Sequence, residues 1–481
     1  MAAALPKTFF SKKYCHSSST STTPLSNSTS NDIFFLAMLL DYLLPAVDTI
    51  TLIYACFGIL LLLYLSKLRP VTLVHAPANS FLKDGTLNSV KSLHKMVIPP
   101  PWCWSSTFQI IFFLLRNLLC DRKVDFINED IVTERGSVKL SWAKEEPDNM
   151  EPPILLFLHG LMCSSDDLPG TGFIHAAIKR GWKVVVHNRP GHVEKLQTPR
   201  FCCFGDWRDV DVAVKHIKQK YPKSHVAAVA FSAGVYPLLR YLGEMGEASQ
   251  LDAAVSISGG IRMTDGLNNC SVLFQQIFLY KAKQFFFEPN EALLRKHDTL
   301  AYDQCMGAMS SEAFMKACVP FITGNTKGTW KEVQALIDPF PTMLNIKTNI
   351  LFLNAEDDPV VQLRSIEPYY NTVFRANPHL LLALSSTGSH CPFLHGCFSP
   401  EDYSMTTTLE FVAHQVQLSS LRRNATRCSN EFKLRKLFQS FSPPKKEDAE
   451  SPRTSVLRKR LERAPLDNVP MNVVPERRGG L

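Results

Sequence analysis

Short apolar runs alternate with amphipathic segments along the middle of the chain, from about residue 126. The runs have the length of buried strands, and the segment Asp209–Lys220 between two of them places Val210, Val214 and Ile217 on one helical face. This alternation is typical of a mostly parallel sheet with helices on both faces, so we expect an α/β fold. The predicted strands are Ile154–Leu158, Val184–Val186, Val226–Phe231, Ala253–Ile257, Ile350–Leu353 and Leu380–Leu384.

A long stretch of helical character, 262–348, interrupts the alternation between two late strands. An insertion there would lie over the carboxyl ends of the strands as a lid, and its apolar side chains would suit an acyl chain. Ordinary helices packed on the sheet would produce the same pattern. Both interpretations stay open.

An uncharged run at Thr49–Leu65 predicts a membrane anchor within 33–66. The run has about the minimum length of a spanning helix. We expect a single-pass membrane protein, with the endoplasmic reticulum as one candidate compartment.

Lys67 and Arg69 follow the span and favour a cytosolic domain. The glycosylation sequons at Asn269 and Asn424 would matter only on the lumenal side. The side of the membrane stays open.

A second apolar run, Thr107–Leu119, is too short to span a bilayer. It either belongs to the core or presses against the membrane beside the anchor, and we favour the core. It lies in a membrane-proximal segment, 67–125, that precedes the predicted catalytic domain, 126–420.

Both ends of the chain differ in composition from this domain. Residues 1–32 are rich in Ser and Thr, which favours a disordered lead over a targeting peptide. Residues 421–481 carry 15 Lys and Arg against 7 Asp and Glu, which is the whole net charge of +8, and we expect them to be mostly disordered. Because the excess charge is confined to this tail, a nucleic-acid-binding domain face is not supported. One tail stretch places apolar residues on a single helical face, which suits an interfacial helix or a last helix docked on the domain: Leu434, Leu437, Phe438 and Phe441.

The 13 cysteines include no C-x-x-C pair, so neither a zinc ribbon nor a dithiol redox motif is indicated. The adjacent pair Cys202–Cys203 has no supporting ligand set nearby. We predict no metal and no cofactor, and the sequence names no protein partner.

Three polar positions follow predicted strands. Ser232 lies in the turn Ala230-Phe231-Ser232-Ala233-Gly234, where small neighbours let the backbone bend tightly and expose the hydroxyl. Asp358 follows the strand ending at Leu353, and His390 follows the strand ending at Leu384. A serine hydroxyl needs a base such as imidazole, and a carboxylate orients that base. The order Ser, Asp, His at successive strand ends therefore predicts a catalytic triad.

The loop His159-Gly160-Leu161 ends another predicted strand. We expect the backbone N–H groups of Leu161 and Ala233 to form an oxyanion hole, and His159 to brace the loop.

These motifs resemble the membrane-anchored α/β-hydrolase-domain (ABHD-type) serine hydrolases of the AB hydrolase-4 branch, over about residues 95–415. The resemblance favours Asp358 over Asp357 as the acid, because Pro359-Val360-Val361 follows it. It implies an α/β-hydrolase fold and hydrolysis of carboxylic esters, chiefly of lipids such as monoacylglycerols or phospholipids. It is carried by Pro100-Pro101-Trp102 with Gln109, His159-Gly160-Leu161, Arg180-Gly181-Trp182, Asn188-Arg189 with Gly191, Thr198-Pro199-Arg200, Arg240-Tyr241-Leu242-Gly243 and Asp357-Asp358-Pro359.

We therefore expect a membrane-associated serine esterase or lipase that passes through an acyl-enzyme at Ser232. Two alternatives stay open: a membrane-tethered scaffold with a hydrolase fold and little turnover, and an acyltransferase that uses the same triad. The expected partners are a lipid or ester substrate and the membrane.

Overall fold

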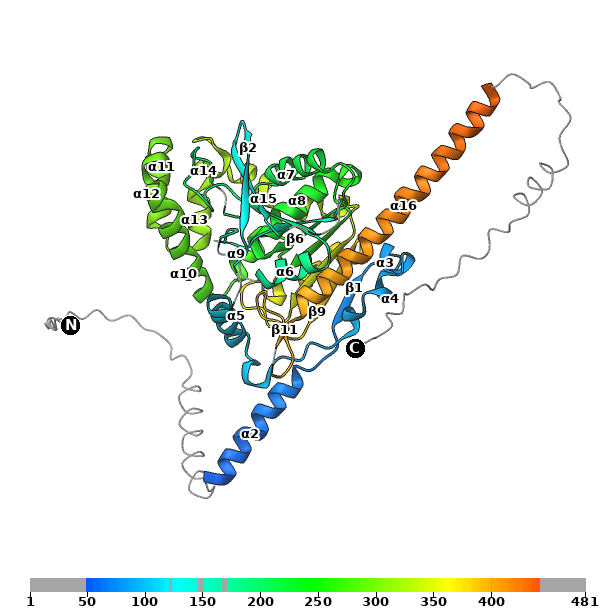
Figure 1. The fold of residues 1–481 in the computed structure, drawn as a ribbon. Helices are drawn as coiled ribbons and strands as arrows, with labels where there is room; N and C mark the ends of the chain where they lie inside the picture. Colours follow the sequence, from blue (N-terminus) through cyan, green and yellow to red (C-terminus); the bar gives the residue numbers. More distant parts are fainter. Residues whose placement is uncertain are drawn as a thin grey trace, which may run out of the picture.

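The computed structural model describes residues 49–120, 123–145, 147, 151–161, 163–166, 171–201, 203–398 and 400–441 (Figure 1). The predicted lead 1–32, the first part of the predicted anchor and residues 442–481 lie outside these ranges.

A nine-stranded sheet forms the centre of the domain, in the order β1-β9-β8-β7-β6-β4-β5-β3-β2. The neighbours from β5 to β9 along this order are parallel, whereas β1, β3 and β2 pair antiparallel at the two edges. The predicted α/β architecture with a mostly parallel sheet is thus confirmed. The strands are β1 (Thr72–His75), β2 (Phe126–Thr133), β3 (Gly136–Ala143), β4 (Ile154–Leu158), β5 (Lys183–Asn188), β6 (Val226–Phe231), β7 (Ala253–Ile257), β8 (Ile350–Ala355) and β9 (Leu380–Ser385).

Each central strand supplies two hydrophobic cores, because successive side chains point to opposite faces of a sheet. In β4, Ile154, Leu156 and Leu158 enter one core, and Leu155 and Phe157 enter the other. All five are essentially inaccessible to water. Burial on both faces explains why these strands appear in the sequence as continuous apolar runs.

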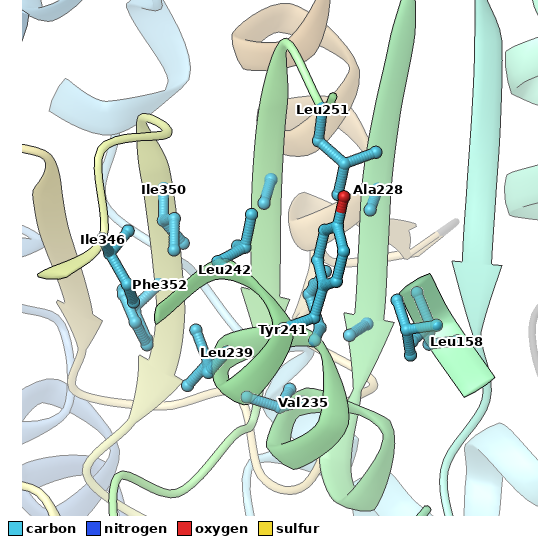
Figure 2. Close-up of a cluster of buried hydrophobic side chains, with 14 of the residues drawn as sticks. Leu158, Ala228, Val235, Leu239, Tyr241, Leu242, Leu251, Ile346, Ile350 and Phe352 are labelled. Atoms are coloured by element: carbon cyan, nitrogen blue, oxygen red, sulfur yellow. The ribbon is translucent and has the colours of Figure 1, made fainter. Parts of the chain in front are cut away.

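The first core lies against α7 (Trp207–Lys220) and α8 (Val235–Met245). Figure 2 shows part of it, where Leu239 and Leu242 of α8 lie against the strands that carry Ala228 and Phe352. The opposite core lies against α6 (Thr171–Lys179), the short helices α3 (Ser80–Lys83) and α4 (Thr86–Ser89), and the first part of α16 (Tyr403–Phe441).

Seven α-helices, together with the π-helix η6 (Ala282–Phe287) and the 3-10 helices η7 (Glu288–Asn290) and η8 (Phe340–Asn345), lie between β7 and β8. The sequence predicted either a lid or ordinary sheet-covering helices there. The observed helices contain their own apolar cluster, centred on Phe287 and Phe321, which also takes in Ala233 from the turn after β6. The helices are α9 (Met263–Asn269), α10 (Val272–Lys281), α11 (Glu291–His297), α12 (Thr299–Gly307), α13 (Ser311–Ala317), α14 (Val319–Thr323) and α15 (Trp330–Ile337).

Helix α2 (Thr49–Ser66) projects away from the domain (Figure 1). None of its side chains, all of which the structure describes, is buried. Eighteen residues of α-helix extend for about 27 Å, close to the thickness of a hydrocarbon core. By length and composition, α2 can therefore cross a membrane.

The apolar run expected in the core forms helix α5 (Ser106–Cys120), and that expectation was wrong. Phe108, Ile111 and Leu115 are 60%, 47% and 50% exposed. The helix is apolar around most of its circumference but contacts the domain along one side only, so its outer face stays uncovered.

Two boundaries also differ from the sequence prediction. Strand β1 joins the main sheet through β9, so the membrane-proximal segment contributes to the domain before residue 126. Helix α16 continues to Phe441, although most of 421–481 was expected to be disordered. The helix still contacts the domain at residue 423, since Arg423 donates to the Asp252 carboxylate at 3.0 Å. The side chains of the predicted interfacial face, 434–441, lie outside the described ones.

Candidate active site

A sharp turn presents Ser232 at the carboxyl end of β6. The 3-10 turn η4 (Ser232–Gly234) connects β6 to α8, and Ser232 has a φ of 50°, a region that costs energy for any residue except glycine. A Cβ at Gly234 would lie 2.5 Å from the Leu158 carbonyl oxygen and 2.6 Å from that of His159. The turn therefore packs so closely on the end of β4 that only glycine fits.

The other two predicted residues meet this serine. His390 Nε2 lies 2.8 Å from Ser232 Oγ, and His390 Nδ1 lies 2.9 Å from Asp358 Oδ2. Asp358 follows β8 and His390 follows β9, which are neighbouring strands. The structure thus brings together the three residues that the sequence separates by as many as 158 positions.

Asp358 is held by the backbone that follows it. Its Oδ1 accepts hydrogen bonds from the N–H groups of Val360 at 2.8 Å and Val361 at 2.9 Å. These two bonds fix the carboxylate and leave Oδ2 facing the imidazole, so the Pro-Val-Val sequence has a direct structural role.

The preceding carboxylate, Asp357, has different hydrogen-bond partners. It accepts from the backbone N–H groups of Gly388 at 3.0 Å and Ser389 at 2.8 Å, and it pairs with Lys67 at 3.3 Å. Asp357 therefore shapes the loop that carries His390, without contacting the imidazole in any hydrogen bond that the structure shows.

The loop around His390 is strained. Ser389, Cys391 and Phe393 all have positive φ, and a Cβ at Gly388 would come within 2.5 Å of the Phe393 ring. Such strain persists only where surrounding contacts impose it, and it is common at functional sites.

Burial and the neighbouring carboxylate act in opposite directions on His390. Burial of the ring opposes its charged form, but the Asp358 carboxylate outweighs burial and holds the pKa of His390 well above its usual range. The pairing of His390 with Asp358 stabilises the imidazolium that forms when the His390 ring takes up a proton.

The predicted oxyanion loop lies against the nucleophile. A Cβ at Gly160 would be 3.6 Å from the Ser232 Cβ, and Leu161, Ser232 and Ala233 line one pocket. Leu161 and Ala233 therefore both lie at the wall of the pocket that contains Ser232. Their N–H groups as the oxyanion hole remain a prediction.

Arg189, at the end of β5, holds this loop from behind. Its guanidinium donates to the His159 carbonyl oxygen at 2.8 Å and to the Gly160 carbonyl oxygen. Burial, together with the Arg189 charge, keeps the pKa of His159 well below its usual range, so the ring is neutral and suited to bracing. Sequence reasoning gave Arg189 no role, and the signal that could have found it is the Asn188-Arg189 motif directly after a strand.

Two apolar compartments meet at Ser232, Leu161, Phe278 and Val360. One, of about 70 Å³, runs under the helices between β7 and β8 and is lined by Phe204, Tyr236, Leu279, Phe314 and Met315, among others. The other, of about 250 Å³, also contains His390 and lies between α5 and α10. Ser232 thus lies where the two apolar compartments join.

The sheet order and the strained Ser232 turn define the α/β-hydrolase fold, and Ser232, His390 and Asp358 lie within hydrogen-bonding distance in that order. No protein-family model matches the chain. It is 27% identical over 340 residues to a Bos taurus protein named phospholipase ABHD3, covering 67% of this chain and 80% of that one. It is 28% identical over 288 residues to the Picea glauca embryogenesis-associated protein EMB8, covering 55% and 60%.

The curated relatives are ABHD-type α/β-hydrolase-domain proteins, which confirms the resemblance drawn from the motifs. Among solved structures, the Pyrococcus furiosus esterase Pf2001 is similar at 17% identity with a TM-score of 0.35, covering 56% of this chain and 85% of that one.

Proposed function

We propose that this chain is a membrane-associated serine hydrolase that cleaves carboxylic esters of lipids through an acyl-enzyme at Ser232. The observation that carries the proposal is the continuous hydrogen-bonded relay from Ser232 Oγ to His390 Nε2 at 2.8 Å and from His390 Nδ1 to Asp358 at 2.9 Å. Such a relay on a strained strand-to-helix turn is suited to nucleophilic acyl transfer.

The reaction follows from this geometry. Ser232 Oγ attacks the ester carbonyl carbon while His390 Nε2 takes the hydroxyl proton, and Asp358 stabilises the resulting imidazolium. The N–H groups of Leu161 and Ala233 stabilise the oxyanion, at about 3–4 kcal/mol for a donor of this kind. His390 then gives its proton to the leaving alcohol oxygen as the C–O bond breaks. In the second half of the reaction, His390 Nε2 takes a proton from water while the water oxygen attacks the acyl carbon. The acyl C–Oγ bond then breaks, the acid leaves, and His390 returns the proton to Ser232 Oγ.

The substrate class is argued from the two compartments. An acyl chain bound at Ser232 finds apolar walls in the compartment beneath α10 and α13, and the alcohol part of the lipid faces the larger compartment between α5 and α10. We assign the helices α9–α15 the role of a lid over the acyl chain. The relatives named phospholipase ABHD3 support a lipid ester as substrate.

We further propose that α2 anchors the chain as a single membrane span. Its length, its uncharged surface and the Lys67 and Arg69 pair at its end support this assignment.

The test is product analysis with the purified full chain in detergent micelles, using phosphatidylcholine and monoacylglycerol with and without added short alcohols. The proposal predicts release of free fatty acid that is lost in Ser232→Ala. Transfer of the acyl group to the alcohol instead of water would point to an acyltransferase. No turnover of either lipid by a folded chain would favour a scaffold.

A further inference from the structure

We propose that α5 and α10 form a membrane-docking surface around the mouth of the active-site pocket, so that a lipid ester passes from the bilayer to Ser232 without crossing water. The proposal rests on the proposed function, since it concerns how the lipid substrate of that site arrives. Its occupant is a phospholipid bilayer.

The two helices form opposite walls of the compartment that contains Ser232 and His390. Helix α5 contributes Ile110, Phe113 and Leu114, and α10 contributes Phe274, Ile277 and Phe278. The mouth of this compartment is therefore bordered by apolar side chains from two helices that are far apart in the sequence.

The outward faces of the same helices are also apolar. On α5, Phe108, Ile111 and Leu115 follow a three- and four-residue spacing that places them on one exposed face. On α10, Leu273 is 63% and Tyr280 61% exposed. Isolated exposed apolar residues are ordinary, but a contiguous apolar rim around a pocket mouth marks an interaction surface.

The anchor fixes which surface faces the bilayer. Tyr64, near the end of α2, donates its hydroxyl to the Pro99 carbonyl oxygen at 2.9 Å, and Lys67 Nζ donates to the Trp104 carbonyl oxygen at 3.3 Å. The segment 99–104 leads directly into α5, so α2 and α5 lie at the same end of the domain (Figure 1). A bilayer crossed by α2 therefore adjoins α5.

Charge around the mouth agrees with a phospholipid surface. Neither α5 nor α10 contains Asp or Glu, and their charged residues are Arg116 and Lys281. Lys281 lines the compartment beside His390. These cations suit the phosphate groups of a bilayer surface, and neither helix carries a carboxylate that would repel them. The carboxylate that does line the compartment, Asp402, accepts a hydrogen bond from Ser404.

The docking surface is tied to the catalytic base. Gln109 Nε2 of α5 donates to Thr387 Oγ1 at 3.1 Å, and Ser389 Oγ donates to the Ser106 carbonyl oxygen at 2.6 Å. Both partners lie in the loop that carries His390. These bonds keep the mouth in a fixed position relative to the triad when α5 rests on a membrane.

A direct test is photolabelling of the full chain in phosphatidylcholine vesicles that contain phosphatidylcholine with a diazirine in one acyl chain. We expect adducts on α2, α5 and α10, and none at Val132, which is 84% exposed on β2, the edge strand opposite β1. Adducts confined to α2 would overturn the proposal. Labelling needs no turnover. Adducts on α5 and α10 of a folded chain whose Ser232 proves unreactive would therefore contradict the proposed function and leave the docking proposal standing.

A matched pair of variants tests the consequence for activity. Leu115→Glu should lower turnover of a vesicle-embedded ester about tenfold or more and leave turnover of a water-soluble short-chain ester nearly unchanged, because a buried apolar contact with lipid is replaced by a charge. Val132→Glu should change neither rate. Equal losses on both esters, or no loss on vesicles, would contradict the proposal.

Discussion

At the scale of the residue, the consecutive carboxylates Asp357 and Asp358 have different partners in the site. Asp358 contacts the His390 ring, and Asp357 binds the backbone of the loop that carries this ring. The sequence alone distinguished Asp358 from Asp357 only through the family resemblance, whereas their different hydrogen-bond partners give a physical reason for the choice.

The two carboxylates should respond differently to removal of charge. Asp358→Asn should lower kcat about 10⁴-fold, the size of loss known for this substitution in another serine triad, because the amide favours the wrong imidazole tautomer. Steady-state hydrolysis of a soluble ester measures this. Asp357→Asn is the matched control and should lower kcat far less, since an amide oxygen still accepts from the loop. A larger loss in Asp357→Asn would reverse the assignment of the acid.

The pH profile should report His390. The base acts as the neutral ring, and the Asp358 carboxylate holds its pKa well above the usual range despite burial. Activity should therefore fall as pH is lowered, with an apparent pKa for kcat/KM above about 6.5. In Asp358→Asn the raising charge is gone, so the residual activity should show this acid limb at lower pH. If the acid limb of the pH profile stays at the same pH in Asp358→Asn, a group other than His390 is responsible for it.

Gly234 should be intolerant of even one methyl group. A Cβ there would press on the carbonyl oxygens of Leu158 and His159, which belong to backbone and cannot give way cheaply. Gly234→Ala should lower the free energy of unfolding by about 1–3 kcal/mol, as overpacking does. Gly172→Ala, with nothing within 4 Å of the new Cβ, should be neutral or slightly stabilising. Chemical denaturation of both variants provides the comparison.

At the scale of the element, the buried strands were predictable and the exposed helix α5 was not. Strands β4, β6, β7, β8 and β9 are buried on both faces, so their sequences are continuous apolar runs that stand out. The outer strands β1, β2 and β3 alternate or are short, and the sequence alone did not mark them. In α5 the apolar composition was correct, but composition does not specify whether protein or lipid covers a helix.

The start of α7 depends on a buried charge cluster. Arg200 pairs with Asp206 at 2.6 Å and with Asp209 at 3.0 Å, and all three residues are buried. Arg200→Met leaves two buried carboxylates without this partner, and it should cost about 3–5 kcal/mol of unfolding free energy. Lys223→Met removes an exposed pair with Glu151 and should change stability by less than about 1 kcal/mol. Comparable losses in the two variants by denaturant titration would contradict this account.

At the scale of the whole molecule, helix α5 and the segment directly after α2 both contact the loops that carry Asp357 and His390. Lys67, directly after α2, pairs with Asp357, and Ser386 donates to the Lys67 carbonyl oxygen. Sequence reasoning placed an anchor and a triad separately, because contacts across 290 positions leave no local pattern. For the same reason it gave no role to Arg189, which acts on a loop 30 positions away. That Ser232, Asp358 and His390 come together was predictable, because each lies in the turn or loop that follows a recognisable buried strand.

The most direct test of the central claim, that Ser232 is an activated nucleophile, is reaction of the folded full chain with a fluorophosphonate, followed by peptide mass spectrometry. The account predicts one covalent phosphonyl adduct on the peptide that carries Ser232, strongly slowed in His390→Ala and absent in Ser232→Ala. A folded chain that forms no adduct, or a Ser232→Ala variant that is labelled as well as the wild type, would contradict it.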